Sequence, residues 1–194
     1  EEVTRLTRLI ENLLAMARIE AGELSLSKKW ESLSEVFHDV LDRCNVAIRH
    51  HQVTVDCHES LPAVLIDSRL IAQALTNLLE NAAKYSPPGS EIVLKAGMKD
   101  DQLLISVTDE GAGVAPEERS RLFEKFYRGM DPQPNGGTGM GLAIARGIIE
   151  AHNGRVWVEG SSGKGATFIF SLQVKHRPAE EVDPANPRHL NRVT

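Results

Sequence analysis

The sequence predicts an α+β protein, a two-layer α/β sandwich with a mostly antiparallel sheet, preceded by one separate helix. Two patterns predict this class. Runs that alternate apolar and polar residues come in pairs joined by short turns, which favours hairpins over the long crossovers of a parallel sheet. Runs with helical periodicity stand between those pairs and supply a second layer. The composition agrees, because 41% of the 194 residues are apolar and 25% are charged, as in ordinary globular proteins.

Charge, cysteine content and hydropathy exclude several classes of protein. The chain has 22 Lys and Arg against 27 Asp and Glu, a net charge of -5, and no basic block that would indicate nucleic-acid binding. Cys44 and Cys57 fall in different predicted elements, which favours a reduced pair over a disulfide framework. No apolar run approaches the roughly 18 residues of a membrane-spanning helix, and no signal peptide opens the chain. Because the sequence starts inside a helical pattern, we expect a soluble segment of a longer protein.

The first predicted element is an amphipathic helix over residues 1–21. Apolar side chains recur in it at spacings of three and four: Leu6, Leu9, Ile10, Leu13, Leu14, Met16 and Ala17. Gly22 is expected to end the helix as a C-cap. A single helix of this length is marginal in water, so its apolar stripe needs a partner. We expect a second helix upstream of Glu1 as that partner; the alternative is that the helix folds back on its own chain.

A polar connector over residues 23–33 leads to a second helix, which begins at Ser32 or Ser34 and ends near His50. The inner face of this helix is expected to carry Phe37, Val40, Leu41, Cys44 and Ala47. An alternating run over residues 52–57 follows and predicts a strand.

The third helix is the strongest pattern in the chain. Asp67 or Ser68 begins it, and the sequence Ser86-Pro87-Pro88-Gly89 ends it after Tyr85. At about 100° per residue, one set of its apolar side chains faces the core. These side chains are Ile71, Ala74, Leu75, Leu78 and Ala82.

The second half of the chain predicts two hairpins with helices between them. The expected elements are strands over 91–96 and 102–108 with a turn at Asp100-Asp101, a helix over 116–126, a mobile Gly- and Pro-rich segment over 128–138, a helix over 141–152, and strands over 155–159 and 167–174 with a turn over 161–165. Residues 176–194 show no apolar periodicity, and we expect a disordered tail there.

A polar stripe runs beside the apolar face of the third helix. Asn77, Asn81 and Lys84 stand at positions i, i+4 and i+7, and two Asn on one line do not favour a helix. A carboxamide oxygen is a hard, neutral ligand suited to Mg²⁺, and an ammonium group one turn further on suits phosphate oxygens. On its own the stripe is better explained as a solvated helix face.

Two glycine-bearing segments add to this stripe. Asp109 to Gly113 lies at a strand end, where an acidic side chain can accept a hydrogen bond from an exocyclic amine and glycines let the backbone approach a flat base. Gly136 to Leu142 runs straight into a helix, where free backbone N–H groups can hold phosphate. Neither segment matches the P-loop or the Rossmann pattern, so the sequence does not favour those folds.

The segments resemble, in order, the sequence motifs of histidine kinases. Asn77 to Tyr85 resembles the N box, Asp109-x-Gly111-x-Gly113 the G1 box, Leu122 to Phe126 the F box, Gly137-x-Gly139-x-Gly141-Leu142 the G2 box, and Gly163-x-Gly165-Ala166-Thr167-Phe168 the terminal glycine motif. Asn12 to Gly22 resembles the end of the second dimerisation helix. One such motif can arise by chance, whereas the ordered set over residues 12–168 is specific.

The resemblance implies a Bergerat-type ATP-binding fold, a mixed, mostly antiparallel sheet with helices on one face, as in gyrase, heat-shock ninety and mismatch-repair ATPases. It divides the chain into half of a dimerisation hairpin over residues 1–22, a linker over 23–33, a catalytic ATP-binding domain over 34–175 and the tail over 176–194.

The resemblance also implies ATP and Mg²⁺ as ligands. Asn81 would bind Mg²⁺ through its amide oxygen, and Asp109 would bind the adenine amine. The other implied residues are Asn77 beside the phosphates or a metal-bound water, Lys84 on the phosphates, Tyr85 beside the sugar or base, Gly111 and Gly113 in the base pocket, Tyr127 and Arg128 toward the γ-phosphate, Gly137, Thr138, Gly139, Gly141 and Leu142 under a lid over residues 117–138, and Thr167. Phe123 and Phe126 are expected to anchor that lid.

Two departures refine the implied activity. In the ATPase branches of the superfamily a glutamate four residues before the magnesium-binding Asn activates water, and here that position is Asn77. Glu80 points about 100° away from Asn81 and is a poor substitute, so we expect phosphoryl transfer to a protein nucleophile. None of the 7 histidines lies in the box that carries the family's phosphoacceptor. We therefore expect the acceptor and its base upstream of Glu1, and no self-labelling by this chain.

The same resemblance suggests partners and a place in the cell. A response regulator would receive the phosphoryl group, and the parent protein would be a homodimer anchored in the membrane, with this portion in the cytosol. Lys28-Lys29-Trp30 and the form of the N box resemble potassium-responsive sensor kinases. The alternatives are a Bergerat ATPase, a serine kinase of the anti-sigma type, and a degenerate binding module.

Overall fold

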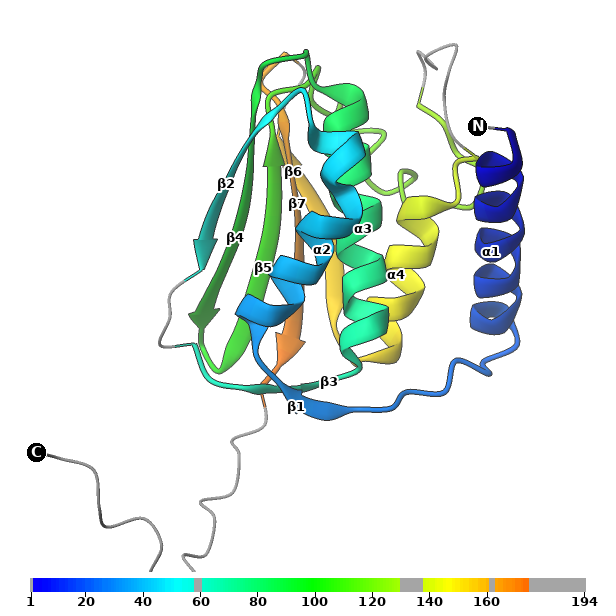
Figure 1. Ribbon diagram of the computed structural model, residues 1–194, viewed down its shortest axis with the longest axis vertical. Helices are drawn as coiled ribbons and strands as arrows, with labels where there is room; N and C mark the ends of the chain where they lie inside the picture. The colour runs from blue at the N-terminus through cyan, green and yellow to red at the C-terminus, as the bar shows by residue number, and fades with distance from the viewer. Residues whose placement is uncertain (1, 58–60, 130–137, 161–162, 175–194) are drawn as a thin grey trace, which may run out of the picture.

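A five-stranded sheet and one layer of helices lie back to back in the computed structural model, which describes residues 2–57, 61–129, 138–160 and 163–174 (Figure 1). The elements are α1 (Glu2–Glu20), β1 (Lys29–Glu31), α2 (Leu33–Ile48), β2 (Gln52–Cys57), β3 (Val64–Ile66), α3 (Ser68–Tyr85), β4 (Glu91–Lys99), β5 (Gln102–Asp109), α4 (Gly141–Ala151), β6 (Arg155–Gly160) and β7 (Ala166–Gln173). Helices α2, α3 and α4 cover one face of the sheet, and α1 lies beyond α4 (Figure 1). The predicted α+β sandwich with helices on one face is confirmed.

The main sheet has the strand order β2-β4-β5-β7-β6. β2 and β4 are parallel, and the other three pairs are antiparallel, which confirms a mixed, mostly antiparallel sheet. The predicted turn between β4 and β5 lies where expected. Asp100 and Asp101 have φ of 48° and 57°, the left-handed conformation that a two-residue hairpin turn requires.

The core lies between the sheet and α3. All five side chains predicted for the inner face of α3 are at most 1% exposed. Alternate side chains of β5 are buried against them, at Leu103, Ile105 and Val107. The N-terminus of α3 is capped as predicted, because the Asp67 carboxylate accepts a hydrogen bond from Leu70 N.

The second helix begins after Ser32 as predicted, but its inner face differs at one position. Phe37, Val40 and Cys44 are buried, whereas Ala47 is exposed, so the prediction for Ala47 was wrong. Ile48 packs against the core in its place, because the helix turns about 100° per residue.

Two short strands were missed in the sequence. β1 lies inside the segment predicted as a plain connector, and it pairs with β3 from Lys29↔Ile66 to Glu31↔Val64. Each strand has three residues, too few for an alternating pattern to show. The pairing attaches the connector to the strand that leads into the N-terminus of α3.

The helix predicted over residues 116–126 was also wrong. This segment consists of successive turns, with hydrogen bonds such as Arg121 N to Glu118 O and Glu124 N to Arg121 O. The segment ends at Phe126, whose φ of 62° no helix accommodates. Most of the segment expected to be mobile and the tail over 176–194 lie outside the described residues.

Helix α1 ends at Gly22 as predicted. Gly22 has a φ of 65°, and the hydrogen bonds Gly22 N to Ile19 O (3.1 Å) and Glu23 N to Arg18 O (2.9 Å) form a Schellman motif. The helix packs on α4 through Met16 and Ile19, while Ile10, Leu13 and Leu14 are 50–54% exposed. One part of the apolar stripe thus folds back on the chain, and the other part faces solvent. Within the described ranges, no helix has the length and apolar content for a bilayer crossing.

Candidate functional site

The C-terminal half of α3 carries the predicted polar stripe. Asn77, Asn81 and Lys84 lie along one side of the helix, and Tyr85 follows Asn81 by four residues. Asn77 and Asn81 are partly buried. The Asn81 carboxamide makes no hydrogen bond with any described residue, so its oxygen is available to a ligand.

Asn77 connects α3 to the first residue of α4. Its Nδ2 donates a hydrogen bond to the carbonyl oxygen of Gly141 at 3.0 Å. The two helices that carry the N-box and G2-box residues therefore meet at this end of the molecule.

Lys84 and Tyr85 end the stripe at the surface. Lys84 Nζ lies 4.6 Å from the centre of the Tyr85 ring and donates a hydrogen bond to the Tyr85 hydroxyl at 3.1 Å. Both side chains are exposed, so this contact contributes little to stability and leaves the ammonium group free to move to an anion.

Asp109 occupies the next inward position of β5 after Val107, so its carboxylate points into the helix layer and is only 5% exposed. Its Oδ1 accepts hydrogen bonds from Gly111 N (2.8 Å) and Ala166 N (3.3 Å). Burial raises the pKa of this carboxyl, and the two backbone donors offset part of the rise. Because Oδ1 has two partners, Oδ2 is the atom left for a ligand.

The loop after Asp109 is packed tightly against the end of α3. A Cβ at Gly111 would lie 2.6 Å from the carbonyl oxygen of Tyr85, so only glycine fits there. Gly113 has a φ of 73°, which also favours glycine. The loop therefore joins β5 to α3 beside the polar stripe.

The second glycine loop contains Gly163 and Gly165, precedes β7 and is hydrogen-bonded to the first loop. Gly165 N donates to Gly111 O (3.0 Å) and Gly163 N to Ala112 O (2.5 Å). A Cβ at Gly165 would collide with the carbonyl oxygen of Asp109. Neither glycine was among the predicted site residues, although the terminal glycine motif was the signal for them. Thr167, which was predicted, contacts Thr108 through their hydroxyl oxygens at 3.1 Å.

The N-terminus of α4 supplies backbone donors. Met140 is the N-cap and provides no side-chain acceptor, so the N–H groups of the first turn point out of the helix without a cap. Thr138 Oγ1 accepts a hydrogen bond from Met140 N at 3.3 Å. Leu142 packs partly against the core. Gly137 lies outside the described residues.

The turn segment that ends at Phe126 contacts the chain just before α4. Phe126 N donates to Gly139 O at 3.0 Å, and a Cβ at Gly139 would collide with the backbone of Phe126. Phe123 is buried edge-to-face on Phe168, with ring centres 6.3 Å apart, and anchors the segment as expected. Phe126 is 64% exposed, so the anchoring role expected for its ring was wrong.

The two residues predicted to reach a γ-phosphate lie at the end of this segment. The Tyr127 hydroxyl donates to Glu118 Oε1 at 3.0 Å, and the Arg121 guanidinium lies 4.5 Å from the centre of its ring. Arg128 is exposed. In this conformation the Tyr127 hydroxyl is therefore bound to Glu118, near the start of the turn segment.

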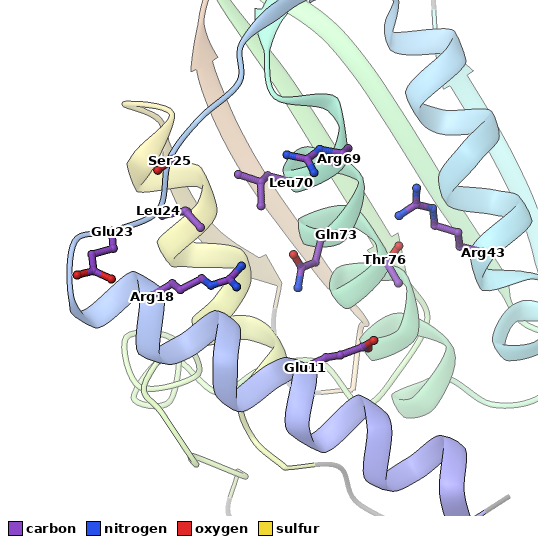
Figure 2. Close-up of a pocket in the computed structure, with 10 residues that line it drawn as sticks. All are labelled: Glu11, Arg18, Glu23, Leu24, Ser25, Arg43, Arg69, Leu70, Gln73 and Thr76. Atoms are coloured by element: carbon purple, nitrogen blue, oxygen red, sulfur yellow. The ribbon is translucent and has the colours of Figure 1, made fainter.

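A separate groove of about 690 Å³ opens between α1 and α3 (Figure 2). It contains none of the predicted site residues. Arg18, Arg43, Arg69, Glu11 and Glu23 line it, and two of these arginines already pair with carboxylates, Arg43 with Asp39 and Arg69 with Asp67. Because it is lined by none of the residues predicted to bind a nucleotide, the candidate site does not lie in this groove.

The elements that carry the predicted residues thus meet at the C-terminal end of α3. Gly141 is bound to Asn77, and Gly111 is packed against Tyr85. Asn81 lies between Asn77 and Tyr85, about one helical turn from each. An acidic strand end, an amide-bearing helix and an uncapped helix N-terminus therefore border one another, a set that can bind a base, a cation and an anion together.

Comparison with known proteins agrees with this arrangement. Residues 66–176 match the family described as histidine kinase-, DNA gyrase B-, and HSP90-like ATPase. The chain is similar to the sensor histidine kinase WalK of Bacillus subtilis, 32% identical over 95% of this chain and 31% of WalK. It is also similar to the sensor protein KdpD of Escherichia coli, 34% identical over 93% of this chain and 20% of KdpD. The chain spans about a fifth to a third of these relatives.

Solved structures show the same likeness. Full-length ShkA in complex with AMPPNP has a TM-score of 0.78 and 30% identity, over 90% of this chain and 37% of ShkA. The mycobacterial sensor histidine kinase MprB has a TM-score of 0.67 and 28% identity, over 76% of this chain and 98% of that structure.

Proposed function

Because the chain belongs to the histidine kinase-, DNA gyrase B- and HSP90-like ATPase family, we propose that it is the ATP-binding catalytic part of a sensor histidine kinase. It binds ATP with Mg²⁺ and transfers the γ-phosphoryl group to a histidine on a helix upstream of residue 1. The similarity to WalK, KdpD and the AMPPNP complex of ShkA supports this function.

The buried carboxylate of Asp109 is the observation that carries the proposal. An acid at 5% exposure is costly unless a ligand uses it. Its Oδ1 is held by Gly111 N and Ala166 N, which orients Oδ2 as an acceptor for the exocyclic amine of adenine. Gly111 and Gly113 then border the base, and Tyr85 flanks the sugar or base.

The donor set beside Asp109 fits a metal-bound triphosphate. Mg²⁺ in such sites takes one or two protein oxygens, and phosphates and water complete the shell. Asn81 offers a neutral amide oxygen without a competing partner among the described residues. Bound Mg²⁺ offsets phosphate charge, and Lys84 and the first-turn N–H groups of α4 bind the remaining phosphate oxygens.

Transfer to a protein acceptor is favoured over hydrolysis. A general base must lie within hydrogen-bond reach of the attacking group. The position four residues before Asn81 holds Asn77, whose amide is bound to Gly141 O and cannot accept a proton. Glu80 projects from another side of α3.

The acceptor histidine is proposed to lie on another helix. Of the histidines that the structure describes, His38, His50 and His51 lie in or after α2, and His152 is buried. The exposed Ile10, Leu13 and Leu14 of α1 are apolar surface for the helical partner that would carry the acceptor in a homodimer. A response regulator then takes the phosphoryl group, and the parent protein holds this part in the cytosol from a membrane anchor.

Calorimetric titration of ATP against Asn81→Ala tests the metal assignment. We expect Mg²⁺-dependent affinity to fall at least about tenfold, because the one protein oxygen on the metal is removed. EDTA should lower wild-type affinity and leave the variant unchanged. Gln73→Ala, two turns earlier on the same helix, is the control. Equal ATP affinity in wild type and Asn81→Ala would remove the assignment.

Phosphoryl transfer is tested with the upstream helical hairpin of the parent protein, added in trans with γ-labelled ATP. Acid-labile, base-stable label on that hairpin supports a histidine kinase. Acid-stable label would instead support a serine kinase. Rapid ATP turnover without label, lost in Glu80→Ala, would support an ATPase.

A further inference from the structure

The candidate site is divided between two helices. Asn81 and Lys84 come from α3, whereas the phosphate-binding N–H groups come from the first turn of α4. Affinity for a triphosphate therefore depends on how the end of α4 is held against α3, a requirement that neither helix meets alone.

The side-chain link between the two helices at this end is the hydrogen bond from Asn77 Nδ2 to Gly141 O, at 3.0 Å. The orientation of the amide is unambiguous, because a carbonyl oxygen accepts only from the NH₂ end of the carboxamide. A Cβ at Gly141 would lie in ordinary contact with Asn77, 3.7 Å from its Cβ and Cγ. The two residues thus meet without compression, and the hydrogen bond adds a directional link to this contact.

The start of α4 is also held by packing, because the Met140 side chain is 2% exposed and Leu142 packs against the core. The polar groups of its backbone have few other partners among the described residues. Its N-cap, Met140, has no side-chain acceptor and an α-helical φ and ψ of -101° and -23°. Among the described residues, Met140 N donates only to Thr138 Oγ1, at 3.3 Å, and the carbonyl oxygen of the preceding Gly139 accepts from Phe126 N. A helix start without a capping acceptor frays more easily than a capped one, so a directional bond from a neighbouring helix helps to fix the first turn of α4 in addition to its packing.

We propose that Asn77 is a positioning residue, which holds the first turn of α4 against α3 so that its N–H groups meet the phosphates bound beside Asn81. Its NH₂ group acts through Gly141. The role rests on the proposed function, because it concerns the phosphate half of that site.

Three variants test the role. Asn77→Asp keeps the shape and an oxygen for a metal-bound water but loses the donor and repels the Gly141 carbonyl. Asn77→Ala removes the link without adding charge. Gln73→Glu, one turn earlier on α3 and partly buried, is the matched control for the amide-to-acid change.

Hydrogen exchange of the Ile144 and Ala145 amides in nucleotide-free protein reports how firmly the first turn of α4 is held. Ile144 N bonds to Met140 O at 2.9 Å in the first turn. We expect about tenfold faster exchange in both Asn77 variants, as for one lost hydrogen bond, and no change in Gln73→Glu. Titrations should show ATP affinity lowered about tenfold in both variants, with adenosine affinity unchanged.

Two results would overturn the role. Unchanged exchange with lost ATP affinity would make Asn77 a direct ligand of the nucleotide, and unchanged exchange with unchanged affinity would leave it no part in the site. Wild-type protein that binds neither ATP nor adenosine would overturn the proposed function itself, which separates the two failures.

Discussion

A single inward-facing position decides the chemistry of the candidate site. Along β5 the side chains of Leu103, Ile105 and Val107 are buried in the core, and the next inward position holds Asp109. Strand geometry therefore buries this carboxylate, which would be solvated one residue earlier or later. An ionised acid in this environment costs stability when no ligand uses it.

Asp109→Asn should lower ATP affinity and raise the stability of the nucleotide-free protein. Burial raises the pKa of Asp109, so at neutral pH the ionised form destabilises the fold. The amide removes that charge, and its oxygen can accept the bonds from Gly111 N and Ala166 N. Its NH₂ group then faces the adenine amine, and because both groups are donors, no hydrogen bond forms between them. We expect a loss of about tenfold or more in affinity and a higher melting temperature.

Calorimetry and thermal unfolding check both effects. Glu110→Gln is the control, because Glu110 is adjacent, exposed and bonded only to Glu91 N in the described part of the chain. A variant Asp109→Asn that is less stable without nucleotide would contradict the argument.

A second buried titratable group, His152, ties α4 to α3. Its Nε2 accepts from Asp67 N at 3.1 Å, and its Nδ1 donates to Ile148 O at 2.8 Å, so the ring is neutral. Burial lowers the pKa of His152; the Ile148 carbonyl and Asp67 act against this, and Lys28 adds to it. Asp67 also accepts from Ser27 N at 2.9 Å, so one cluster joins the connector, α3 and α4.

The lowered pKa predicts a loss of stability in mild acid. The unfolded chain binds a proton at the ordinary pKa of 6.5 while the folded chain does not. The stability is therefore fully present above 6.5 and declines as pH falls below it, by at most about 1.4 kcal/mol per pH unit for one proton. Urea unfolding between pH 7.5 and 5.5, a range we choose on the basis of the ordinary histidine pKa, should show this slope in wild type and a smaller one in His152→Gln. An equal slope in the two proteins would contradict the prediction, and exposed His38→Gln is the control.

The polar residues of the site and of the His152 cluster differ in how far the sequence predicts them. Asn77, Asn81 and Asp109 stand in recognisable motifs, so their types and order indicated nucleotide chemistry before any geometry. The partners of these side chains were not predictable, because Gly141 lies 64 residues from Asn77 and Ala166 lies 57 from Asp109. Asp67 and His152 were missed as a pair, since their contact spans 85 residues.

At the scale of elements, long periodic patterns were predicted and short or irregular ones were not. The strand over 52–57 and the core face of α3 agree with the structure. β1 and β3 are too short to show a period, and residues 116–126 have helix-like composition but only turn hydrogen bonds. In that segment the contact of Phe123 with Phe168 and the left-handed Phe126 are tertiary features that local propensity does not contain.

Two glycines in one loop offer a matched test of how that loop supports the site. Gly163 and Gly165 have nearly the same φ, 78° and 75°. A Cβ meets open space at Gly163 and the carbonyl oxygen of Asp109 at Gly165. The substitution Gly163→Ala should lower the free energy of unfolding by about 1 kcal/mol, the cost of a left-handed alanine. Gly165→Ala should lower it by more than about 3 kcal/mol, because the start of β7 must move.

Urea unfolding and ATP titration check the pair. Gly165→Ala should also lose ATP affinity, since displacement of β7 moves Ala166 N away from Asp109, whereas Gly163→Ala should keep it. Equal losses of stability in the two variants would show that the backbone conformation, and not the contact with Asp109, makes glycine necessary at both positions.

At the scale of the whole molecule, α1 is a weakly attached element. It meets α4 through Met16 and through Ile19, which lies over Gly147, and the exposed ion pair of Glu20 with Lys125 links it to the turn segment. Surface ion pairs contribute little, and an isolated helix of 19 residues is marginal in water. The order of α1 therefore depends on the apolar contacts of Met16 and Ile19, together with those of the half-buried Leu9 and Ala15.

Ile19→Asp should release α1 from the domain while the domain itself stays folded. A carboxylate over Gly147 cannot be buried without a partner, so we expect the amides of residues 9–20 to exchange at rates close to those of an unstructured peptide. The amides of α3 and β5 should stay protected, and ATP affinity should be unchanged, because no candidate site residue lies on α1. Leu13→Asp introduces the same charge at a position that is 51% exposed and should leave α1 docked. Equal exchange in the two variants would mean that the contact with Gly147 does not hold α1, and loss of ATP affinity in Ile19→Asp would mean that the docked helix supports the nucleotide site through the segment that Lys125 belongs to.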